Sequence, residues 1–148
     1  MFAHAFLAVA FLGIFSCSFG QAQVDPPAAA RTHLNGTYSG AVVKEWKEGK
    51  KHFKAEFRLK DETYRAYYSP EGVWVRTEHN VKKSELPEPV TAALLRSKYG
   101  KWKIEEVEEH ASPRQASIFK VRLKTETKKA ELDFAPDGRI LKESEKLK

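Results

Sequence analysis

The most constraining feature of the sequence is an internal repeat. Two stretches with alternating apolar residues and a Pro-x-Gly turn recur along the chain at a constant shift of 66 residues. Phe57 then aligns with Leu123, and the turn Pro70–Gly72 aligns with Pro136–Gly138. A match without gaps over two apolar alternations and a turn indicates that one unit occurs twice.

The repeat also sets the domain organisation. Upstream of the first match the shift is 61 residues, so the second copy contains five extra residues (66 − 61) at about 110–115. We therefore expect a single domain over 23–148, made of two repeats at about 26–86 and 87–148.

Each copy is expected to begin with a helix. Glu88–Lys98 has apolar residues at helical spacing, prolines in its first turn and Gly100 just past its end. The equivalent segment Pro27–Thr37 is rich in alanine but contains Asn35-Gly36. We expect this first helix to be shorter or frayed.

Four strands are expected after each helix. In the first copy they are Ala41–Trp46, His52–Leu59, Thr63–Ser69 and Val73–Val81. In the second copy they are Trp102–Glu108, Ser117–Lys124, Lys128–Ala135 and Arg139–Ser144. The clean alternation of the middle strands gives one apolar and one polar face. The predicted fold class is α+β: a tandem α-β4 repeat whose helices pack on one face of an antiparallel sheet and leave the other face open.

The motifs of the first copy resemble those of a known bacterial family. Ala55–Leu59, Tyr64–Glu78 and Leu86-Pro87 are similar to the "A-x-F", "Y-x-A-x-F", "D-x-D-G-x-W", "T-E" and "L-P" pattern of the PepSY-like, or β-lactamase-inhibitor-like, proteins. Asp61-Glu62 and Ser69 depart from that pattern at turns. The resemblance implies a tandem helix-plus-four-strand layout in an exported protein. The family has no assigned reaction, and an inhibitory role is inferred from its architecture.

The first 22 residues are typical of a signal peptide. They contain no Asp, Glu, Lys or Arg, and the apolar run Ala5–Phe15 is too short to span a membrane. Cleavage is expected after Ala22, which predicts a periplasmic or secreted protein without a transmembrane helix in its mature part. The alternative is a lipoprotein anchored through Cys17.

The sequence offers little for catalysis. The one cysteine lies in the signal peptide, there is no Gly-x-Ser-x-Gly motif, and the four other histidines after His4 lack metal-ligand spacing. The acidic cluster Glu105–Glu109 has no calcium-loop pattern and is interpreted as a solvated strand end. We expect no enzyme, no metal, no cofactor and no nucleic-acid partner.

The charge pattern points to a binding surface. The chain has 26 Lys and Arg against 20 Asp and Glu. If Asp61-Glu62 forms a two-residue turn, Arg58 lies opposite Arg65, beside Tyr67 and Lys54. The same reasoning pairs opposite charges in the second copy, with Arg122 facing Glu131 and Lys120 facing Asp133.

These four residues, Lys54, Arg58, Arg65 and Tyr67, form the predicted binding site. An acidic protein of the cell envelope would relieve the repulsion between two opposed arginines, and an inhibitor-like role toward that partner is the more specific form of this prediction. Two alternatives stay open. The arginines can extend into water and bind nothing, or the protein can bind an anionic polymer or lipid headgroup through Lys44, Lys47, Lys50, Lys51 and Lys54.

Overall fold

A computed structural model describes residues 24–148 of the chain. The expected signal peptide over 1–22, with Cys17, lies outside the described residues. The first half contains helix α1 (Ala28–Thr37) and strands β1 (Val42–Glu48), β2 (Phe53–Leu59), β3 (Glu62–Tyr68) and β4 (Trp74–Asn80). A short 3-10 helix η1 (Lys83–Glu85) leads to α2 (Glu88–Arg96), β5 (Lys103–Ser112), β6 (Gln115–Lys124), β7 (Lys128–Phe134) and β8 (Ile140–Leu147).

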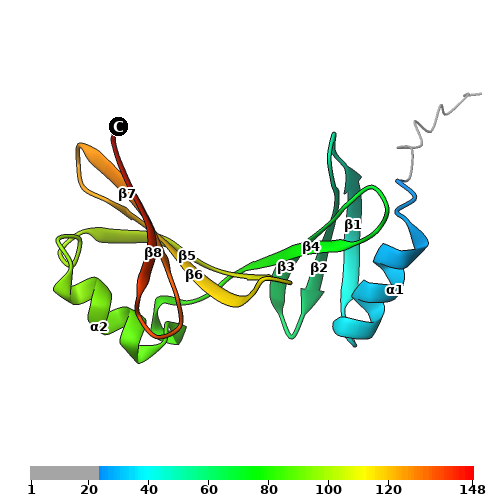
Figure 1. The fold of residues 1–148 in the computed structure, drawn as a ribbon, viewed down its shortest axis with the longest axis horizontal. Coiled ribbons are helices and arrows are strands. Elements are labelled where there is room, and N and C mark those ends of the chain that lie inside the picture. Colours follow the sequence, from blue (N-terminus) through cyan, green and yellow to red (C-terminus); the bar gives the residue numbers. More distant parts are fainter. Residues whose placement is uncertain (1–23) are drawn as a thin grey trace, which may run out of the picture.

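All eight strands form one antiparallel sheet. Each strand pairs with the next one along the chain, in the order β1 to β8, so the sheet is an open meander with β1 and β8 at its edges (Figure 1). The expected α+β class and antiparallel sheet are confirmed. In each half a helix precedes four strands.

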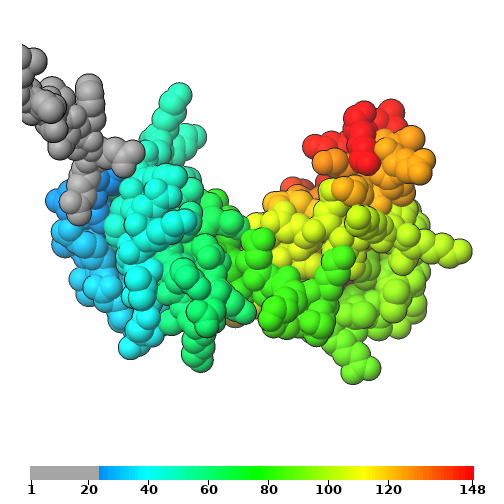
Figure 2. All heavy atoms as spheres, turned by 180° about the vertical axis from the view of Figure 1, so that it is seen from behind, coloured from blue at the N-terminus to red at the C-terminus, as the bar shows by residue number. Residues whose placement is uncertain are grey.

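Both helices cover the same face of the sheet. Ala30 and Leu34 of α1 pack against β2 and β3, while Val90 and Leu94 of α2 pack against β5, β6 and β7. The strand register connects the two patches, because Ala66 pairs with Thr77 and Thr77 pairs with Ala111 on the same side. We call the other, uncovered side the open face. The molecule is bowed, with the helices outside and a hollow between its two ends (Figures 1 and 2).

The first helix is not shortened as expected. Helix α1 has 10 residues and α2 has 9, and Asn35 and Gly36 lie within α1. Both residues are exposed, and a Cβ on Gly36 would meet nothing within 4 Å. The buried Leu34 next to them anchors the helix to the core. Burial therefore outweighs the low helix propensity of these two residues.

The turn between β2 and β3 differs from the expectation. Lys60 and Asp61, rather than Asp61 and Glu62, occupy the turn, with φ angles of 49° and 67°. As a result Arg58 faces Thr63, and Arg65 faces Glu56. The prediction of two opposed arginines is wrong: a two-residue shift keeps each side chain on its expected face but changes its partner.

In the second half the expected register is confirmed. Arg122 faces Glu131, and Lys120 faces Asp133. Both pairs of opposite charge lie on the open face.

The extra residues of the second half join the two halves of the sheet. Strands β5 and β6 have 10 residues each, whereas β1 and β2 have 7 each. Strand β4 pairs with the segment Glu108–Ala111 near the far end of β5. The β5–β6 hairpin therefore extends through residues 110–115, where the sequence predicted extra residues, and β4 adds to this longer hairpin.

Candidate functional site

The open face carries a connected set of ion pairs that crosses five strands. Cationic and anionic side chains contact one another from β3 to β7, and we call these residues the charge network. They are Arg65, Arg76, Glu78, Glu106, Glu108, His110, Arg122, Lys120, Glu131 and Asp133.

In the first half, Arg65 links two carboxylates. Its guanidinium lies 2.6 Å from Glu108 Oε1 and 3.6 Å from Glu78 Oε2. The other oxygen of Glu78 accepts a hydrogen bond of 2.6 Å from Arg76 Nε. The Arg76 guanidinium also lies 3.8 Å from the centre of the Tyr67 ring, in cation–π contact.

Glu108 is the centre of the network and is only 5% exposed. Its second oxygen lies 3.2 Å from His110 Nε2 and 3.0 Å from a guanidinium nitrogen of Arg122. The hydrogen bond with His110 and the charges of Arg122 and Arg65 outweigh burial and lower the pKa of the Glu108 carboxyl to about 2. Glu108 is therefore ionised throughout the physiological range.

The network continues into the second half. Arg122 Nε lies 3.3 Å from Glu131, and Lys120 Nζ lies 2.9 Å from Glu131 and 3.5 Å from Asp133. The hydrogen bond from Lys120 is the main reason that the pKa of Glu131 is lowered. Glu106 also pairs with Arg122. Each cation of this part is thus held by carboxylates from neighbouring strands.

The four residues of the predicted site are not all brought together. Arg65 and Tyr67 join the charge network, and the Tyr67 hydroxyl donates to Glu78 at 3.3 Å. Lys54 lies directly opposite Tyr67 in the sheet. Arg58 lies near the β2–β3 turn instead, 59% exposed, with Asp61 as its ion-pair partner at 3.2 Å.

The lysines of the alternative site do not form one cluster of unpaired cations. Lys44 pairs with Glu56 at 3.0 Å, and Lys47 pairs with Glu45 at 2.8 Å. Lys50 and Lys51 are exposed between β1 and β2.

One group on the open face has ligand atoms that could hold a metal ion. Atoms of Glu78, Glu108 and His110 lie within 4.8 Å of one another. However, all four carboxylate oxygens already contact Arg65, Arg76, Arg122, Tyr67 or His110. A metal ion would have to displace guanidinium groups, so the geometry favours a structural role for this cluster.

Five members of the network were not placed on this surface by the sequence analysis: Arg76, Glu78, Glu106, Glu108 and His110. Glu78 and Glu108 lie on β4 and β5, the pair that joins the halves, and both are buried. The interpretation of Glu105–Glu109 as a solvated strand end is wrong for Glu108, because β5 continues to Ser112. The length of the insertion was the one indication that this strand is longer than its counterpart.

Within residues 24–148, neither helix is long and apolar enough to cross a membrane.

Comparison with solved structures shows the fold. A BLIP-like protein from Bacteroides fragilis superposes with a TM-score of 0.76 at 23% identity, over 84% of this chain and 89% of its own. A DUF2874 family protein from Bacteroides ovatus gives a TM-score of 0.75 at 22% identity, over 82% and 89% of the two chains. A candidate periplasmic protein from Bacteroides eggerthii gives a TM-score of 0.73 at 20% identity, over 82% of this chain and 90% of its own. The chain therefore has a BLIP-like fold.

No protein-family model matches the sequence, and no curated protein matches it.

Proposed function

We propose that this protein is a non-enzymatic binding module that engages a protein partner through the open face of its sheet. The observation that carries the proposal is the charge network, which lies on the hollow, uncovered side of the molecule. Arg65, Arg76 and Arg122 alternate there with buried carboxylates. Inhibition of the partner is the more specific form of this proposal.

Preorganisation supports a binding role. Glu78 of β4 and Glu108 of β5 hold Arg65, and Glu108 also holds Arg122, so these side chains lose little freedom when a partner binds. Tyr67 presents a half-buried ring beneath Arg76. Arginine and tyrosine dominate the residues that contribute most to protein–protein binding.

The surface we propose differs from the one expected from the sequence. It is centred on Arg65, Tyr67 and Arg76, with Lys54 beside Tyr67 and Arg58 extending it toward the β2–β3 turn. Arg58 and Arg65 do not face each other, so repulsion between them cannot attract a partner. Instead, the arginines are already oriented and keep free N–H donors for carbonyl or carboxylate groups of a partner.

We also propose that the chain is an exported, PepSY-like protein built from two copies of one unit. The signal-peptide pattern of residues 1–22 supports export, as does the periplasmic location proposed for the Bacteroides eggerthii protein of the same fold. The equal order of a helix and four strands in each half supports duplication.

The test requires a partner and two variants. The biotinylated protein is used to capture partners from a periplasmic extract of the bacterium that encodes it, and the dissociation constant is then measured with the purified partner. Tyr67→Ser is expected to weaken binding by at least about tenfold, because it removes an aromatic contact at the centre of the surface.

Leu95→Ser is the matched control. Leu95 is exposed on α2, away from the open face, and its replacement is expected to leave binding unchanged. The thermal midpoint of each variant shows that it is folded. Equal binding by Tyr67→Ser and the wild type, or failure to retain any partner, would overturn the proposal.

A further inference from the structure

A row of lysines crosses the open face at the end farthest from β1. In the register of the sheet Lys103 pairs with Lys124, Lys124 with Lys129, and Lys129 with Lys146. Directly paired residues in antiparallel strands point to the same side, so these four ammonium groups line one strip across β5–β8. We call this strip the lysine row.

The row is only partly neutralised. Glu105 contacts Lys124, and it lies 3.8 Å from Lys129. Within residues 24–148, neither Lys103 nor Lys146 has a carboxylate within ion-pair distance. Like charges placed directly opposite one another disfavour folding. A sheet that keeps four of them in register has a surplus of positive charge that an anionic ligand would relieve.

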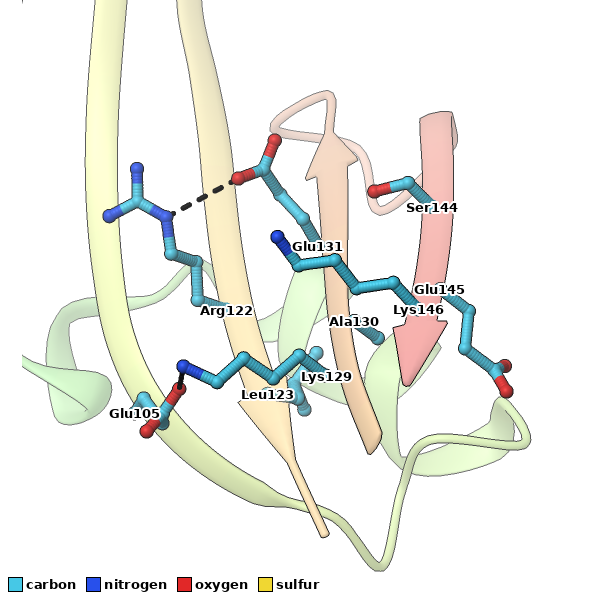
Figure 3. A pocket seen from close by; sticks show the side chains of 9 residues that line it. All are labelled: Glu105, Arg122, Leu123, Lys129, Ala130, Glu131, Ser144, Glu145 and Lys146. Carbon is cyan, nitrogen blue, oxygen red and sulfur yellow. Dashed lines mark hydrogen bonds and ion pairs between the residues drawn. The ribbon is translucent and has the colours of Figure 1, made fainter. Parts of the chain in front are cut away.

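Two hollows lie along the row. One, of about 380 Å³, is lined on the open face by Arg122, Lys129, Glu131, Ser144 and Lys146, with Glu105 at its side (Figure 3). The other, of about 460 Å³, contains Lys103 and Lys124 together with Lys101 and Lys148. Lys124 of one hollow and Lys129 of the other are directly paired in the register, so the two hollows lie next to each other along the row.

The spacing favours a ligand with repeated charge. Adjacent strands lie about 4.8 Å apart, so the four lysines extend over about 14 Å in a line across the strands. Lysine is a flexible point charge that does not impose the planar geometry of a single bound group. A linear polymer with regularly spaced anionic groups matches such a row better than one isolated anion does.

The acceptors among the lysines specify the ligand further. Glu105 and Glu131 carry carboxylates and Ser144 a hydroxyl between or beside the ammonium groups. They would repel a polymer made only of anions, but they accept hydrogen bonds from hydroxyl groups. A ligand that suits both sets of groups carries acidic groups and hydroxyl donors in alternation.

We infer that the lysine row binds a linear acidic polysaccharide of the uronic-acid type. Its carboxylates would lie over Lys103, Lys124, Lys129 and Lys146, while its hydroxyl groups would donate to Glu131 and Ser144. This inference goes beyond the proposed function, because it assigns a different class of ligand to the lysine row, which adjoins the charge network at Arg122 and Glu131.

The test uses a short oligogalacturonate as the probe, with binding to the purified protein measured by calorimetry at low and high salt. The wild type is expected to bind, with an affinity that falls as salt increases. Replacing two lysines, Lys129→Gln with Lys146→Gln, is expected to weaken binding about tenfold. A neutral malto-oligosaccharide of the same length is expected not to bind.

A second double variant removes the same charge elsewhere. Lys50→Gln with Lys51→Gln alters the β1–β2 turn, and oligogalacturonate binding is expected to stay unchanged. If both double variants lost oligogalacturonate affinity equally, only the net charge of the protein would matter, and the inference would be overturned. So would the absence of binding, or equal or tighter binding of sodium polyphosphate or poly-glutamate. Tyr67→Ser should leave this binding intact, which separates the inference from the proposed protein-binding surface.

Discussion

At the scale of single residues, Glu108 determines how the open face is organised. Its carboxylate is nearly inaccessible to water, yet it stays charged because Arg65, Arg122 and His110 surround it. Removing the partners of a buried carboxylate destabilises a protein strongly, because an unpaired charge is left in its interior. We therefore assign to Glu108 the role of holding two arginines in place on either side of the seam between β4 and β5.

Glu108 makes stability depend on acid pH. Its pKa is lowered from 4.5 to about 2 in the folded protein, so its contribution is complete above about pH 4.5 and is lost as the pH falls toward 2. A shift of this size corresponds to about 3 kcal/mol. At neutral pH we expect Glu108→Gln to lower the free energy of unfolding by about 3 kcal/mol, and this difference to shrink near pH 2.

Chemical denaturation at several pH values measures this effect. Glu126→Gln, at an exposed site in the β6–β7 turn, is the control and should cost little at any pH. The assigned role would be contradicted if the difference in unfolding free energy between Glu108→Gln and the wild type were the same at pH 7 and at about pH 2.

At the scale of elements, the turns show what the sequence could and could not predict. The helices and the faces of the strands follow from apolar spacing, but the β2–β3 turn contains no glycine to mark its centre. Lys60 and Asp61 adopt positive φ values there, which local sequence does not favour for lysine. The predicted shift of 66 residues agrees with the observed turn, because the β6–β7 turn is centred on Glu126 and Thr127, which align with Lys60 and Asp61.

Gly72 and Gly138 occupy turns that pack against the helices. Gly72 and Gly138, in the two Pro-x-Gly turns, have positive φ values of 87° and 86°. A Cβ on Gly138 would lie 2.3 Å from the carbonyl oxygen of Pro89, in the first turn of α2. The β7–β8 turn can therefore contact α2 only when this residue is glycine.

We expect Gly138→Ala to destabilise the protein by at least about 3 kcal/mol, since both the backbone angle and the contact with Pro89 are unfavourable for alanine. Gly40→Ala is the matched control: Gly40 also has a positive φ, 83°, but nothing lies within 4 Å of its Cβ position. It should cost about 1–2 kcal/mol. Equal losses of unfolding free energy in the two variants would show that the turn does not press against the helix.

At the scale of the whole molecule, the pairing of β4 with the far end of β5 makes the two halves one continuous sheet. Within residues 24–148 the buried core forms two clusters, one under each helix, and neither cluster spans the β4–β5 seam. The charge network crosses that seam on the open face, through Arg65 and Glu108. Sequence reasoning located the insertion but not its effect, because pairing between β4 and β5 depends on strand length rather than on any local motif.

The measurement that tests the central claim most directly is backbone-amide chemical-shift mapping of the protein with its captured partner. If the open face is the binding surface, the largest changes should fall on β3, β4 and β5, around Tyr67, Arg76 and Glu108, while the outward side of α1 and α2 remains unchanged. Changes confined to the helices, or to the edge strands β1 and β8, would contradict this account and would place the partner elsewhere on the fold.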